Sequence, residues 1–177
     1  MVIDGACTVS SAQPWVVDAG RFAREHCRAS GVLALTQLPR LHDILFDREG
    51  AVSYAVEGYI SAKGWPALRI SLTAELALRC QRCLERLPLR LDVQRHLVLA
   101  PEASELDALE DEDDDTDAIP GVGALDLHDL LEQEIVLSAP MAPRHPGDAC
   151  GVPPMTATMG EASARFAALA GLKAQPR

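Results

Sequence analysis

Between Leu68 and Arg79 apolar and polar residues alternate, and the alternation runs directly into Cys80-Gln81-Arg82-Cys83. The even positions from Leu68 to Leu78 are apolar, whereas most odd positions are charged or carry a hydroxyl group. A two-residue period is typical of a strand with one buried face, because successive side chains point to opposite faces of a sheet. The segment therefore predicts a half-buried strand that ends in a cysteine pair.

Alternating segments also precede and follow this strand. Apolar side chains recur over residues 52–60 and again at every second position over 87–93, and Lys63-Gly64-Trp65-Pro66 has the composition of a turn. We therefore predict a three-stranded antiparallel meander whose second hairpin has the cysteine pair at its tip. The alternation fails at Arg95, which we interpret as a β-bulge.

Two segments have the helical pattern. Asp18 is a suitable N-cap for a helix that would continue through Cys27 and stop near Gly31. Asp126 can cap a second helix with an apolar stripe, which Pro140 would end. The expected fold class is α+β, with an antiparallel sheet covered by helices.

Charge is distributed unevenly along the 177 residues. The net charge is −10, but residues 101–143 hold 14 acidic residues and no Lys or Arg, whereas residues 1–100 hold 12 basic against 10 acidic residues. We predict one domain over residues 15–177, interrupted by a mobile acidic loop at about 102–120, after a loose leader over 1–14. The start of the sequence does not resemble a secretory leader and no membrane-spanning stretch is evident, so we expect a cytoplasmic protein.

The cysteine pair indicates a possible metal site. Cys80 and Cys83 supply two thiolates, and His145 and Cys150 offer an imidazole and a thiol in a later Pro/Gly-rich segment. Together they make a candidate tetrahedral site for a structural zinc ion. Two alternatives remain at this point: small thiols packed in a turn, and a redox pair whose thiolates the neighbouring arginines would favour.

Arginines are concentrated around the same hairpin, at Arg79, Arg82, Arg86 and Arg90, with Arg95 further along. Such a cluster can contact the phosphates of a nucleic acid. An ordinary solvated strand face is an equally good interpretation, and aromatic residues for base stacking are few nearby. The acidic loop could instead bind a basic protein surface. Since common catalytic motifs do not occur, we do not expect an enzyme.

Taken together, several segments resemble one bacterial family. These are Cys80 to Glu85 after an alternating strand, the acidic loop, Leu125 to Pro140, His145 with Cys150, and Phe166 to Lys173. Their order and spacing are similar to those of the YceD family, the large ribosomal RNA subunit accumulation proteins, from about Asp18 onward. In the resemblance, the family's cysteine pair falls on Cys80 and Cys83, and its later His and Cys fall on His145 and Cys150.

The resemblance implies a function that composition does not reveal. It implies a non-catalytic role in the accumulation, processing or stability of 23S ribosomal RNA during large-subunit biogenesis. The expected partners are ribosomal RNA or a precursor large subunit, together with a basic ribosomal protein or assembly factor. The alternative is a protein–protein adaptor that engages a ribosomal protein or assembly enzyme through the acidic loop and does not contact RNA.

Overall fold

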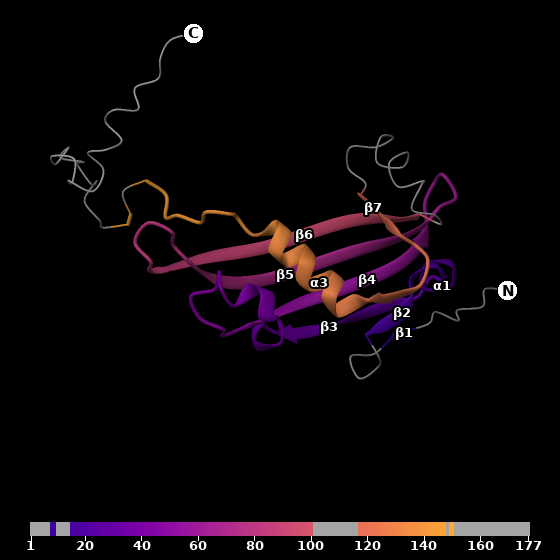
Figure 1. Ribbon diagram of the computed structural model, residues 1–177, viewed down its shortest axis with the longest axis horizontal. Coiled ribbons are helices and arrows are strands. Elements are labelled where there is room, and N and C mark those ends of the chain that lie inside the picture. The colour runs from indigo at the N-terminus through magenta and orange to yellow at the C-terminus, as the bar shows by residue number, and fades with distance from the viewer. Residues whose placement is uncertain (1–7, 10–14, 101–116, 148, 151–177) are drawn as a thin grey trace, which may run out of the picture.

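The computed structural model describes residues 8–9, 15–100, 117–147 and 149–150. Within these ranges the chain forms an α+β fold, in which a mixed, mostly antiparallel sheet is combined with two α-helices (Figure 1). The strand order in the sheet is β1-β3-β4-β5-β6-β7. The predicted α+β class is confirmed, although the sheet has parallel pairs at both edges.

The centre of the sheet is a meander of three long strands, β4 (Ala51–Ile60), β5 (Pro66–Arg79) and β6 (Arg86–Ala100). The apolar even positions of β5 are buried, as the alternation predicts. Pairing between β5 and β6 continues without interruption from Arg79 opposite Arg86 to Ala67 opposite Val98. The predicted bulge at Arg95 is therefore wrong.

Arg95 is a charged residue in an otherwise apolar series, and an ion pair between β6 and the helix at residues 127–138 explains its presence there. Arg95 lies on the same face of β6 as its apolar neighbours, and its Nε is 3.4 Å from the Glu134 carboxylate, which is itself buried. Because Glu134 offsets the charge, an arginine fits into an apolar series without a change of register.

Three shorter strands complete the sheet. β3 (Arg28–Ala34) runs antiparallel to β4, whereas β1 (Thr8–Val9) and β7 (Asp117–Pro120) are parallel to β3 and β6, respectively. Thr8–Val9 thus forms a strand within the predicted leader, and Asp117–Pro120 forms one within the predicted acidic loop. The rest of that loop, residues 102–116, lies outside the described residues, as does the Phe166 to Lys173 segment.

The two helices begin where predicted. Asp18 accepts a hydrogen bond from the Arg21 backbone N–H at the start of α1 (Ala19–Arg24), and Asp126 caps α3 (Leu127–Ser138) in the same way. Each cap ends a strand of a small antiparallel ribbon, β2 (Val16–Asp18) with β8 (Ala124–Asp126). α1 is shorter than expected, because Gly31 belongs to β3 rather than ending the helix.

Apolar side chains from the helices and from one face of the sheet form a single core. α3 lies across this face in Figure 1, and Leu131 and Ile135 of α3 are fully buried with Leu72 of β5. α1 packs closely on β4 at Gly58, where any side chain would collide with the Phe22 carbonyl oxygen. Two 3₁₀ turns, η1 (Leu35–Gln37) and η2 (Pro39–Leu41), add further leucines to the core. We call the opposite, polar side of the meander the open face.

Candidate metal centre

The hairpin tip, residues 80–85, connects β5 to β6. The Cys80 N–H donates to the Glu85 carbonyl oxygen at 3.0 Å, and the Leu84 N–H donates to the Cys80 carbonyl oxygen at 2.9 Å. Leu84 has a φ of 64°, in the left-handed region that a side chain with a Cβ enters at a cost. This tight turn folds the two cysteines toward each other.

The segment that follows α3, residues 139–150, lies against this tip. The Gln81 N–H donates to the Pro143 carbonyl oxygen at 2.8 Å, and Arg82 Nη1 donates to the Gly147 carbonyl oxygen at 3.5 Å. Figure 1 shows the orange segment after α3 reaching the turn between β5 and β6. These two hydrogen bonds bring two parts of the chain, more than sixty positions apart in the numbering, to one corner of the molecule.

Four side chains converge at this corner: Cys80, Cys83, His145 and Cys150. Their ligand atoms all lie within 4.8 Å of one another. The Cys80 and Cys150 sulfurs are 3.7 Å apart, and His145 Nδ1 is 3.4 Å from the Cys83 sulfur and 3.8 Å from the Cys150 sulfur. Cys80 and Cys150 are buried, while the other two side chains are half-buried.

These separations can be compared with those around a tetrahedral ion. Metal–sulfur bonds of about 2.3 Å and metal–nitrogen bonds of about 2.05 Å at tetrahedral angles place ligand atoms about 3.6–3.8 Å apart. The Cys80–Cys150 sulfur distance and the two distances from His145 Nδ1 to sulfur fall within about 0.2 Å of that range. All four ligand atoms lie within 4.8 Å of one another, so the four residues form a group that could hold a metal ion.

The orientation of the imidazole is set by a backbone partner. His145 Nε2 lies 3.1 Å from the Arg86 carbonyl oxygen, which can only accept a hydrogen bond. Nε2 must therefore carry a proton, and in the neutral imidazole the lone pair of Nδ1 is directed toward the sulfurs of Cys83 and Cys150. A histidine ligand held by a carbonyl through its other nitrogen is a common arrangement at metal sites.

Backbone N–H groups also act on the thiols. Burial alone would raise the pKa of Cys80, but the backbone N–H groups of Cys83, Arg82 and His145 outweigh it and lower this pKa to about 5. Burial raises the pKa of Cys150, and the adjacent sulfurs of Cys80 and Cys83 raise it further. The Cys80 thiolate is thus ready to bind a cation, whereas ionisation of Cys150 requires positive charge nearby.

A second group of potential ligands, His128, Asp129 and Glu132 on α3, already has a cation beside it. Arg40 lies 3.2 Å from the Asp129 carboxylate and 3.6 Å from that of Glu132. Because the guanidinium balances these charges, the group is satisfied without a metal ion. Sequence spacing did not indicate this pairing, since Arg40 lies far from α3 in the chain.

The predicted RNA-binding arginines lie on and beside the hairpin tip. Arg79 and Arg86 are opposite each other in the ladder and Arg90 is four residues further on, so all three project from the open face. Arg82 is on the tip itself, and all four side chains are exposed. Arg86 pairs with Asp47 at 3.1 Å and Arg90 lies opposite Glu75, so the least balanced part of the cluster is at the tip.

Sequence reasoning brought together the four candidate ligands but not the contacts that position them. The Arg86 and Pro143 carbonyl groups orient His145 and Gln81, respectively, through the backbone alone. Any residue supplies a carbonyl group, so no sequence signal marks these partners.

The chain was compared with known proteins. Searches of curated proteins and of solved structures returned no match. No helix within the described ranges is long and apolar enough to cross a membrane. The family described as large ribosomal RNA subunit accumulation protein YceD matches residues 68–173, which is more than half of the chain and includes most of β5, all of β6 and α3, and all four candidate ligands. The match begins later than the resemblance in the sequence, which starts at about Asp18, but it covers more than half of the chain, and this chain belongs to the YceD family.

Proposed function

We propose that this protein is a cytoplasmic, non-catalytic factor that supports the accumulation, processing or stability of 23S ribosomal RNA during large-subunit biogenesis. Membership of the YceD family supports the link to large-subunit ribosomal RNA. The observation that carries the proposal is the exposed arginine cluster on a hairpin tip tied to the segment after α3. A fixed array of guanidinium groups suits the phosphate backbone of folded RNA.

Zinc is the ion that we propose for the centre. Three sulfurs and one imidazole nitrogen, all within 4.8 Å of one another, are a donor set that zinc prefers, whereas magnesium and calcium prefer oxygen ligands. Four protein ligands leave no open position, which supports a structural rather than a catalytic role. The zinc would supply the cross-link between the hairpin tip and residues 143–150.

Burial favours this interpretation over a redox pair. A reactive thiolate needs access to its substrate, but the side chain of Cys80, whose pKa is lowered to about 5, is fully buried. The Cys150 sulfur, from the other segment of the chain, lies 3.7 Å from the Cys80 sulfur. The low pKa accordingly fits a Cys80 thiolate that binds a metal ion rather than one that reacts with a substrate.

Charge reversal at the tip tests the proposed RNA contact. Arg82→Glu with Arg86→Glu should weaken association with precursor large-subunit particles, measured by co-sedimentation of the purified protein over a range of salt concentrations. Each lost phosphate contact should reduce the slope of log affinity against log salt by about 0.7–0.9. Zinc content is measured in the same samples, because Arg86 also provides the carbonyl that orients His145.

A matched double variant, Arg24→Glu with Arg28→Glu, provides the control. Both arginines are exposed at the end of the sheet away from the hairpin tip, so this variant carries the same change in net charge. It should bind particles with nearly the wild-type salt slope. Equal losses in the two double variants, or wild-type binding by the tip variant with its zinc retained, would reject the tip as the RNA contact.

The second candidate is an adaptor that acts only through proteins. Residues 102–116 of the acidic loop, which lie outside the described residues, have the charge to engage a basic ribosomal protein or assembly enzyme. Ultraviolet crosslinking in cells separates the two candidates. Adducts between RNA and residues 79–90 support direct contact, whereas protein adducts alone favour the adaptor. Site-dependent cutting of precursor RNA by the purified protein would contradict a non-catalytic role.

A further inference from the structure

The outer edge of β6 is largely unpaired within the described residues. β7 pairs with β6 only over Leu97 to Ala100, and at the other end His145 contacts the Arg86 carbonyl oxygen. Between these two contacts, no strand within the described ranges pairs with this edge. Residues 87–96 therefore form an edge of about ten residues that is bounded at both ends.

The direction of the backbone groups along this edge follows from the ladder. Cys80 donates to Glu85, so this is a hydrogen-bonded pair, and hydrogen-bonded pairs recur at every second residue of an antiparallel ladder. Odd-numbered residues of β6 consequently bond to β5, and even-numbered ones point outward. The Arg86 and Ala100 carbonyl groups both accept hydrogen bonds on the outer side, as this phase requires.

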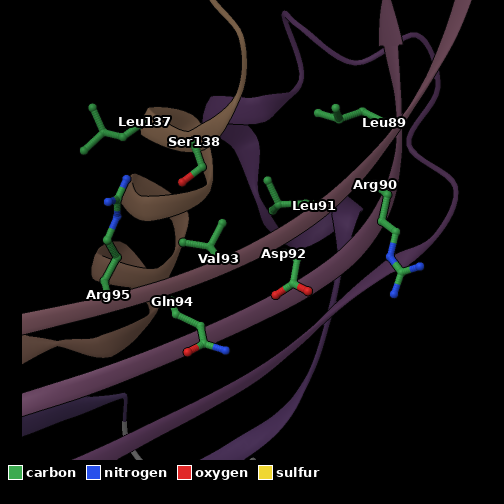
Figure 2. A pocket seen from close by; sticks show the side chains of 9 residues that line it. All are labelled: Leu89, Arg90, Leu91, Asp92, Val93, Gln94, Arg95, Leu137 and Ser138. Carbon is green, nitrogen blue, oxygen red and sulfur yellow. The ribbon is translucent and has the colours of Figure 1, made fainter.

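The surroundings of the edge suit a second strand. Figure 2 shows a hollow between β6 and the end of α3, with the side chains of Arg90, Asp92 and Gln94 directed away from the side occupied by α3. Leu137 of α3 lines this hollow and is 65% exposed. Pro88 has no N–H, so it reduces pairing at one position but leaves the outward groups at 90, 92 and 94 available.

We infer that this edge pairs with the same edge of a second copy of the chain, antiparallel and about a two-fold axis at Leu91. The centre of the free edge lies between Leu91 and Asp92, so an axis at either residue would use it fully. With the axis at Asp92, two carboxylates face each other. With the axis at Leu91, Arg90 of each copy lies opposite Asp92 of its partner, and Leu89 lies opposite Val93.

Charge complementarity therefore selects both the occupant and the register. Residues 90 and 92 are outward-pointing, so in this register they exchange backbone hydrogen bonds as well as facing each other with opposite charge. On the face of the sheet that α3 covers, Leu91 of one copy would contact Leu91 of the other, beside the exposed Leu137. A symmetric pairing of this kind closes the assembly at two copies, because each chain uses the same β6 edge for its partner. The inference does not depend on the proposed RNA contact.

The test is the molar mass in solution, measured by sedimentation equilibrium with the full chain. We expect a mass twice that of one chain for the wild type and a single-chain mass for Asp92→Arg, which places two arginines opposite each other. The charge swap Arg90→Asp with Asp92→Arg restores opposite charges across the axis and should restore the dimer. Each variant is made with Glu75→Gln, so that the new carboxylate does not face Glu75 across the β5–β6 ladder.

Controls make every outcome decisive. Asp43→Arg carries the same charge change at an exposed position away from this edge and should leave the dimer unchanged. Circular dichroism confirms that each variant is folded. A monomeric wild type, or a dimer that persists in Asp92→Arg, would overturn the inference. A folded charge-swap protein that remains monomeric would overturn the register centred on Leu91, and a heteromeric complex in place of the dimer would identify a different occupant for the edge.

Discussion

The two ends of the β5–β6 hairpin are stabilised in different ways. Beneath α3, apolar side chains from helix and sheet interlock, and Leu72 and Leu131 are completely buried. Toward the tip, the described part of the apolar core stops at Leu78 and Leu89, and the residues beyond contribute ligands, backbone hydrogen bonds and exposed arginines. The comparison indicates that ordinary burial holds one end, while the other end is built from backbone hydrogen bonds and the four candidate ligands.

The largest expected effect comes from removing the proposed metal. With a chelator, amides at the tip should exchange with solvent more than about tenfold faster, since structural zinc supplies much of the local folding free energy. Gln81 and Leu84, whose N–H groups close the tip, are the reporters, and the amide of Leu72 in the core is the reference. Mass-spectrometric or NMR exchange measures both. An equal increase in amide exchange at tip and core would mean that the two ends of the hairpin are not stabilised independently.

Leu131→Ala tests the end of the hairpin that is held by the apolar core beneath α3. The side chain is fully buried, so truncation should lower the free energy of unfolding by about 2–5 kcal/mol in urea denaturation. Zinc content should remain that of the wild type, because the cluster lies outside the apolar core. Val122→Ala, at a position 74% exposed, is the control and should change stability by less than about 0.5 kcal/mol. Loss of the metal in a folded Leu131 variant would contradict the division.

The buried Glu134 predicts a pH dependence that belongs to the core end. Burial raises the pKa of Glu134, Arg95 lowers it and Asp117 raises it, and the net result is a raised value. A raised pKa in the folded state means that the stability from this group is present below the unfolded pKa and is lost as pH rises through the folded one.

The wild type should therefore lose stability relative to Glu134→Gln as pH rises from about 4.5, the ordinary value for a glutamate, toward neutrality. Urea denaturation of both proteins at each pH measures the difference, so titration of other groups cancels. A difference that stays constant over this window would show that Glu134 is not responsible.

Leu84 offers the smallest effect, at the tip. Its φ of 64° is unfavourable for any residue with a Cβ and its side chain is 63% exposed, so Leu84→Gly should stabilise the protein by up to about 1 kcal/mol. Leu84→Ala keeps the Cβ and should bring no such gain. Thermal unfolding of the metal-bound proteins compares them, and equal stabilities would indicate that the turn is not strained.

Local patterns correctly predicted those elements whose conformation and burial are determined by their own residues. Alternation identified the long strands of the meander, and Asp18 and Asp126 identified the starts of both helices. The same reasoning failed where a residue served a distant neighbour. Gly31 suggested the end of a helix, but it belongs to β3 and leaves room for the ring of Tyr54, whose hydroxyl would lie 3.0 Å from an added Cβ.

Long-range pairing also limited what could be foreseen at the candidate site. The residue types in Cys80, Cys83, His145 and Cys150 were enough to suggest a shared centre, because thiol and imidazole groups have recognisable metal chemistry. β1 and β7 could not be anticipated, since short parallel edge strands depend on partners elsewhere in the chain. The presence of Arg95 in an apolar series is likewise explained only by its ion pair with Glu134 of α3.

The metal content of freshly purified protein tests the central claim most directly. Elemental analysis should find about one zinc ion per chain in the wild type and a loss of that zinc in Cys150→Ser, which removes the ligand contributed from the segment after α3. A folded wild-type protein that contains no zinc, and whose tip amides are nevertheless protected from exchange, would contradict the account.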